Sequence, residues 1–126
     1  MDKQAVNTAH APQAIGTYSQ AIRCGELLFV SGQIPLDPAT GKLVSGGREA
    51  EVRRVFDNLK AIAEAGGGSL NSVVKLNVYL TDLGDFPLIN QVMPDYFSAP
   101  FPARAAIGVA ALPLGAQVEV EAIVSL

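Results

Sequence analysis

The chain has 126 residues, of which 49% are hydrophobic and 17% are charged, and its formal net charge at pH 7 is −3. This length predicts one domain with a real hydrophobic core, and the low charge content favours a surface that is partly covered in an oligomer. The acidic balance argues against a nucleic-acid-binding protein, and the glycines and prolines that interrupt every uncharged stretch argue against a membrane span.

The first half of the chain is predicted to contain an arm, two strands and a long helix. The arm has no apolar signal region, which predicts a cytoplasmic protein. The helix is the clearest element, because apolar residues recur at helical spacing and three consecutive glycines follow it. The expected elements are an irregular arm over 1–15, strands over 17–23 and 27–33, a turn over 36–42 and a helix over 48–65.

The next two elements are a strand and a shorter helix. Residues 73–80 alternate between apolar and polar side chains, which predicts a strand with Val74 and every second residue after it on one face. A helix is expected over 86–97, with Asp85 as its N-cap. Pro94 lies inside this stretch and is expected to kink the helix or end it early.

Two strands are expected to close the chain, over 103–110 and 117–125. Alternation in the last strand places Glu119 and Glu121 on the face opposite four apolar side chains. The order of elements predicts an α+β domain with helices packed on one face of a mixed sheet. The other face of such an apolar sheet is expected to be covered by another subunit.

Arg104 is the only basic residue after Lys75, and it lies in a strongly apolar stretch. A guanidinium in such a strand is costly unless an anion meets it. That anion is either a carboxylate of the chain, Glu119 or Glu121, or a carboxylate on a ligand, which a planar guanidinium binds well. The sequence leaves both alternatives open. Small side chains such as Ala106 on the same face leave room for a pocket.

Glu119 is expected near the same opening, where a carboxylate can hold and deprotonate a water molecule. Other chemistry is disfavoured. His10 is the lone histidine and has no set of metal ligands around it, and Ser31 lacks the histidine of a nucleophilic triad. Cys24 is the single cysteine, which excludes an internal disulfide and a thiolate metal site. No metal site is expected from these residues.

Four motifs in register resemble the Rid family, also called RidA or YjgF. They are AIGTYSQA at 14–21, SGQIP at 31–35, FDNL at 56–59 and FPAR at 101–104. The resemblance extends over nearly the whole chain, so residues 1–126 are expected to form a single Rid-family domain. It is nearest to the RidA subgroup, the 2-iminobutanoate/2-iminopropanoate deaminases. It implies a chorismate-mutase-like fold, with a six-stranded mixed sheet and two helices on one face, and a homotrimer with ligand clefts between subunits.

The resemblance also implies an activity and the residues that carry it. The activity is hydrolysis of 2-imino acids, or their enamine tautomers, to 2-oxo acids and ammonia without a cofactor, which removes intermediates released by pyridoxal-phosphate enzymes. Arg104 would bind the substrate carboxylate and Glu119 would orient the attacking water. Many members have Cys where this chain has Ala106, and the role implied there is carried by the backbone N–H. The further residues that the resemblance places in the cleft are Tyr18, Ser31, Gly32 and Asn90.

Two alternatives to a deaminase are retained. The first is a non-catalytic protein that binds 2-oxo acids or other small molecules in the same cleft between subunits. Glu119 favours the enzyme, because carboxylate binding alone needs Arg104 and no acid that activates water. The second comes from older descriptions of the family as ribonucleases or translation inhibitors, and the acidic net charge argues against it.

Overall fold

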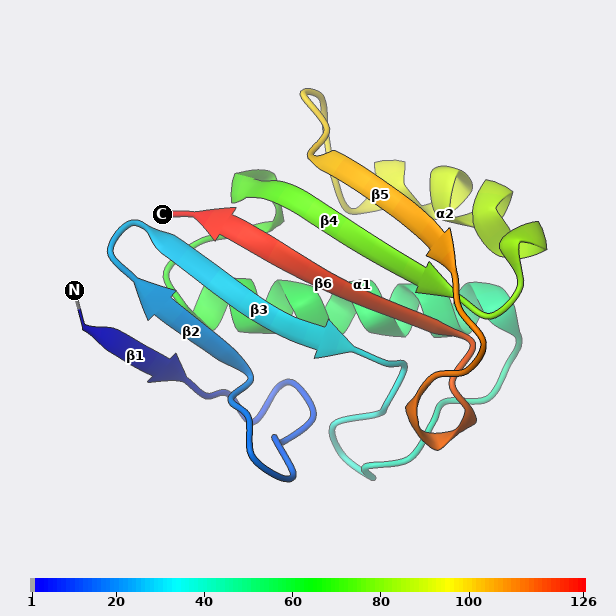
Figure 1. The fold of residues 1–126 in the computed structure, drawn as a ribbon, viewed down its shortest axis with the longest axis horizontal. Coiled ribbons are helices and arrows are strands. Elements are labelled where there is room, and N and C mark those ends of the chain that lie inside the picture. Colours follow the sequence, from blue (N-terminus) through cyan, green and yellow to red (C-terminus); the bar gives the residue numbers. More distant parts are fainter. Residues whose placement is uncertain (1) are drawn as a thin grey trace.

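A computed structural model describes residues 2–126 and shows a six-stranded mixed sheet with both helices on one face (Figure 1). The strand order is β1-β2-β3-β6-β4-β5, with β4 and β5 parallel and every other neighbouring pair antiparallel. This confirms the predicted α+β class. The strands are β1 (Lys3–Val6), β2 (Ala21–Cys24), β3 (Leu27–Gln33), β4 (Val73–Leu80), β5 (Ala103–Gly108) and β6 (Val118–Ser125), and the helices are α1 (Arg48–Ala65) and α2 (Phe86–Val92).

The long helix α1 lies behind the middle of the sheet (Figure 1) and contacts β3 and β6. Its bounds agree with the predicted 48–65. The helix ends at Ala65 with Gly66 as its C-cap, and Gly67 has a φ of 95°, a conformation that glycine adopts at little cost. The side chains that α1 buries lie on one face of the helix, at the spacing that its sequence predicts: Val52, Val55, Phe56, Asn58, Leu59, Ile62 and Ala63.

The two faces of the sheet differ sharply in exposure. Alternate residues of β6 are buried beneath the helices, as predicted. On the opposite face Phe29 is 44% exposed and Ile107 is 49% exposed. Val74 was expected to be buried but is 46% exposed, and Val73 is buried in its place. The pairing of β4 with β6 shifts register between Val73 and Lys75, and a shift of one residue moves a side chain to the other face.

The N-terminal predictions were partly wrong. Residues 3–6 form the edge strand β1, although an irregular arm was expected over 1–15. The next strand begins at Ala21 and not at residue 17. Residues 7–20 contain no helix or strand. Pairing of β1 with β2 supplies the hydrogen bonds of this short edge strand, and a contact between segments so far apart leaves no local pattern in the sequence.

The second helix is shorter than the predicted 86–97. It ends at Val92, and a 3₁₀ turn over Met93–Asp95 contains Pro94, which has no N–H to continue an α-helix. Asp85 occupies the N-cap position of α2, as predicted, but its side chain makes no capping hydrogen bond. Its carboxylate instead accepts a hydrogen bond from Arg48 Nε at 2.8 Å. Within residues 2–126 no helix combines the length and apolarity needed to cross a membrane.

Candidate functional site

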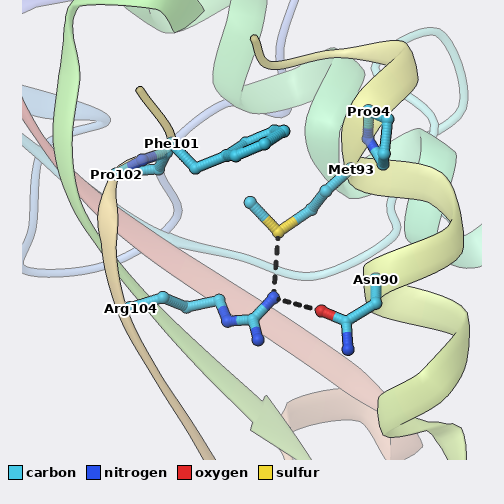
Figure 2. Close-up of a pocket in the computed structure, with 6 residues that line it drawn as sticks. All are labelled: Asn90, Met93, Pro94, Phe101, Pro102 and Arg104. Atoms are coloured by element: carbon cyan, nitrogen blue, oxygen red, sulfur yellow. Dashed lines mark hydrogen bonds between the residues drawn. The ribbon is translucent and has the colours of Figure 1, made fainter. Parts of the chain in front are cut away.

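Arg104 lies at the edge of the sheet, on β5, and α2 holds its guanidinium in place (Figure 2). Its Nη1 nitrogen donates hydrogen bonds to Asn90 Oδ1 at 2.7 Å and to the sulfur of Met93 at 3.3 Å. The guanidinium carbon also lies 5.0 Å from the centre of the Phe86 ring, a favourable cation–π distance. These contacts orient the guanidinium. The cavity beside it has a volume of about 410 Å³ and is lined by Asn90, Met93, Pro94, Phe101, Pro102 and Arg104.

Among residues 2–126, no carboxylate forms an ion pair with Arg104. Over the described part of the chain, the arginines that form ion pairs are Arg48 and Arg53. The register of the sheet explains why. Arg104 pairs with Leu76 on β4, whereas Glu119 pairs with Tyr79, three residues further along that strand.

Residues an odd number of positions apart on a strand point to opposite faces, so Arg104 and Glu119 lie on opposite faces of one subunit. Leu76 is fully buried under the helices, which places Arg104 on the helix-covered side and Glu119 on the uncovered side. The prediction that both residues share one opening is therefore wrong for a single subunit. The alternative of an internal ion pair between them is excluded for the same reason.

Glu119 lies in a second cleft, of about 610 Å³, on the uncovered side of the sheet. Three residues predicted for the site come together with it there, Tyr18, Ser31 and Gly32. The register of β3 against β6 shifts between Val30 and Gln33, which is the signature of a bulge at this point. A Cβ atom on Gly32 would lie 2.0 Å from Oε2 of Glu119, so glycine is needed to leave room for the carboxylate.

The surroundings of Glu119 raise the pKa of its carboxyl group. Burial is the larger cause, and the negative charge of Glu121 is the second. Glu121 is held by the Tyr79 hydroxyl, which donates to it at 3.0 Å, and by the Asn77 amide at 3.4 Å. A carboxylate with a raised pKa accepts a proton more readily, which suits a general base.

The other predicted residues have distinct surroundings. The Ser31 hydroxyl donates to the carbonyl of Ser19, so it is already engaged in the chain. The Tyr18 ring is 54% exposed on the cleft, and its hydroxyl accepts a hydrogen bond from the N–H of Ile15 at 3.3 Å. Ala106 packs against the core, two residues after Arg104 on β5. Asn90 contacts Arg104 directly and is therefore placed to orient it.

Three residues beside Arg104 were not predicted for the site: Met93, Phe86 and Phe101. A signal for Met93 was present, because it follows Asn90 by three residues and such positions lie on the same face of a helix. Phe86 has no such signal, since its place under the guanidinium depends on how α2 packs against β5. Over residues 2–126, no group of three His, Cys, Asp or Glu side chains is placed to hold a metal ion.

The fold and the two clefts define an α+β protein with a cation on one side of the sheet and a carboxylate on the other. The chain belongs to the family described as endoribonuclease L-PSP, whose model matches residues 8–126. The resemblance to Rid proteins is confirmed by a solved structure of RidA from an Antarctic Psychrobacter species. It is 52% identical, has a TM-score of 0.94, and the match covers 98% of this chain and 99% of that one.

Other relatives carry different names. A RutC family protein of Sinorhizobium fredii is 54% identical over 96% of both chains. A protein of Dermatophagoides farinae named 2-iminobutanoate/2-iminopropanoate deaminase is 45% identical, over 97% of this chain and 95% of its own. The solved structure of Escherichia coli TdcF with bound serine is 36% identical with a TM-score of 0.91, over 98% of each chain. The family therefore includes proteins named as deaminases beside members with other names.

Proposed function

We propose that this protein is a cofactor-independent deaminase that hydrolyses 2-imino acids, such as 2-iminopropanoate and 2-iminobutanoate, to 2-oxo acids and ammonia. Relatives named as deaminases support the reaction class. The observation that carries the proposal is the pair of unmatched charges, because Arg104 and Glu119 each lie in a cleft without an oppositely charged partner among residues 2–126.

The site is assembled between subunits of a homotrimer, with Arg104 from one subunit and the Glu119 cleft from the next. Two observations support this arrangement. The two residues lie on opposite faces of one subunit, so only a neighbouring copy brings a guanidinium to the Glu119 cleft. The uncovered sheet face also exposes Phe29 and Ile107, which a neighbour would bury. An interface between two different surfaces closes into a ring when its rotation allows.

In the proposed reaction Arg104 binds the carboxylate of the substrate and places its C2 carbon beside Glu119. Glu119 accepts a proton from a water molecule as the water oxygen bonds to C2 and the C=N double bond becomes single. The proton then passes from Glu119 to the nitrogen, which gives a tetrahedral carbinolamine. As the C–N bond breaks, the proton of the C2 hydroxyl moves by way of the Glu119 carboxylate to the departing nitrogen, so that ammonia leaves and the C2 carbonyl forms. An imine carbon is already electrophilic, so positioning and one base supply much of the rate enhancement.

The first experiment generates imines with an amino-acid oxidase and measures how fast they disappear. We expect the wild type to accelerate the loss, Arg104→Ala to abolish the acceleration, and Glu119→Gln to lower turnover by about 100-fold. Arg23→Ala and Glu64→Gln remove exposed charges and serve as matched controls with wild-type rates. Full activity in Arg104→Ala, or no acceleration by folded wild type with either imine, contradicts the proposal.

A mixing experiment tests the shared site. Arg104→Ala and Glu119→Gln subunits are refolded together in equal amounts, and turnover is compared with that of each variant alone. In a ring of three shared sites, random mixing restores about a quarter of wild-type activity, because every mixed trimer regains one intact site. Sites contained within one subunit would give no recovery. Light scattering on the wild type measures the oligomeric state independently.

The family description names one competing function, which is cleavage of RNA. Nine basic side chains against twelve acidic ones make a phosphate-binding surface unfavourable. Titration with labelled RNA at low and high salt distinguishes a ribonuclease from the proposed deaminase, and a parallel titration with a 2-oxo acid tests ligand binding. A salt-dependent affinity together with RNA cleavage would favour the ribonuclease, whereas 2-oxo acid binding without imine turnover would favour a ligand-binding protein.

A further inference from the structure

Three polar side chains are buried in residues 2–126, and all three are amides: Gln20, Gln33 and Asn58. A buried amide is favourable only when its donors and acceptors are bonded. Each of these amides donates to backbone carbonyls in segments that line or adjoin the Glu119 cleft. All three buried amides therefore hold backbone segments that form or adjoin the walls of the Glu119 cleft.

Gln20 makes the most bonds of the three and is 1% exposed. Its amide nitrogen donates to the carbonyls of Pro12 at 2.8 Å, Thr8 at 3.0 Å and Ala11 at 3.3 Å. Its amide oxygen accepts a hydrogen bond from the Thr8 N–H at 2.7 Å. One side chain thus satisfies four backbone groups of the segment 8–12.

Ala11 of this segment packs in the hydrophobic core, but no helix or strand supports the segment, because residues 7–20 contain neither. It continues directly into the cleft, whose lining includes Pro12, Ile15 and Tyr18. Ile15 is 85% exposed, so packing against the core does not hold it. The four hydrogen bonds of Gln20 replace the backbone hydrogen bonds that a neighbouring strand would supply. They fix the path of segment 8–12, which leads into the rim residues Ile15 and Tyr18.

We propose that Gln20 is a positioning residue of the ligand cleft, acting through segment 8–12 on the rim residues Ile15 and Tyr18. The inference rests on the proposed function for the identity of the ligand. Gln20 is itself one of the residues that line the cleft, but it is only 1% exposed. Its loss therefore weakens ligand binding and leaves the chemical step almost unchanged. Losing an interaction that contributes equally to binding of the substrate and of the transition state raises KM without lowering kcat.

The test compares Gln20→Met, which keeps the length of the side chain but removes all four hydrogen bonds, with Gln4→Met at an exposed site as its control. We expect the Kd for 2-oxobutanoate and the KM for imines to rise about tenfold in Gln20→Met, with kcat within about twofold of wild type. Amide hydrogen exchange is expected to accelerate in residues 8–15 while β3 and β6 keep their protection.

Gln20→Glu supplies a second variant with a pH signature. Its carboxylate still accepts from the Thr8 N–H, but it opposes three carbonyl oxygens to which the amide donated. A protonated carboxyl group donates to one of them. We therefore expect its affinity, relative to wild type at the same pH, to improve from pH 8 to pH 5, whereas that of Gln20→Met does not.

Several results would overturn the inference. They are unchanged affinity and exchange in Gln20→Met, a loss of kcat at constant KM, or faster exchange throughout the sheet. If neither Gln20 variant folds, Thr8→Pro is compared with Thr8→Val. Thr8→Pro removes the N–H bonded to Gln20 and also the hydroxyl that accepts from the His10 N–H, whereas Thr8→Val removes the hydroxyl alone. Thr8→Pro must raise KM above that of Thr8→Val or the inference fails. Failure of the proposed function is separate, because wild type would then bind 2-oxobutanoate without consuming imine. Wild type that binds neither compound refutes both.

Discussion

Replacing Gly32 by alanine tests the Glu119 cleft with the smallest possible change. The added Cβ would lie 2.0 Å from Oε2 and 2.9 Å from Cδ of Glu119. Ordinary contacts between such atoms are about 3.5 Å, so the carboxylate must move by about 1.5 Å or rotate away. The φ of Gly32 lies outside the range that favours glycine, which leaves this clash as the main effect.

The magnitude follows from that displacement. Misplacing a catalytic group by about 1 Å typically costs about 100-fold in rate, so we expect kcat of Gly32→Ala to fall about 100-fold. Overpacking of this kind destabilises a protein by about 1–3 kcal/mol, which still leaves a folded domain. The loss of turnover should therefore greatly exceed any loss of folded protein in a thermal melt.

A double-mutant cycle isolates the contact between the two residues. The imine-consumption assay is run on wild type, Gly32→Ala, Glu119→Gln and the double variant. If Gly32→Ala acts by displacing the carboxylate, the double variant is no slower than Glu119→Gln alone, because the group has already lost its function. Additive losses, or wild-type turnover in Gly32→Ala, would refute the reasoning.

Three further predictions concern orientation, charge and loop support. Asn90→Ala should raise KM about fivefold to tenfold in steady-state kinetics, because the lost hydrogen bond orients Arg104; an unchanged KM argues against this role. Burial raises the pKa of Glu119, so the folded state binds this proton more tightly than the unfolded chain, and stability falls as the pH rises from about 4.3 through the folded pKa. Thermal melts of Glu119→Gln between pH 4 and pH 8 should lack this decline, and identical pH slopes would contradict it. Asn58→Ala should lower the free energy of unfolding by about 2 kcal/mol in urea, because two loop carbonyls lose a buried donor; a change below about 0.5 kcal/mol would exclude that support.

Local patterns were sufficient for the regular elements that pack against the core. The apolar spacing of 48–65 predicted α1 to the residue, and the alternation in 117–125 predicted the buried face of β6. Both patterns arise within one segment and are set by burial on one side. The edge strand β1 escaped prediction because its hydrogen bonds come from β2, and a bulge reversed the expected burial of Val74.

The candidate site divides in the same way. Arg104 and Glu119 were recognisable from sequence, because a charged group in an apolar strand is costly to bury unless it is paired or binds a ligand. Their arrangement was not, since the face that a strand residue occupies depends on which strand it pairs with and in which register. The same limit applies to Phe86 and to Gln20, whose partners lie across the fold or in an irregular segment.

By itself, the amino-acid sequence determined the α+β class, the family and the residue types available for chemistry, because composition, periodicity and motifs are properties of the chain. The tertiary structure decided that the guanidinium and the carboxylate occupy opposite faces of one sheet. The physical reason is that side-chain direction alternates along a strand, so strand order and register assign each group to a face.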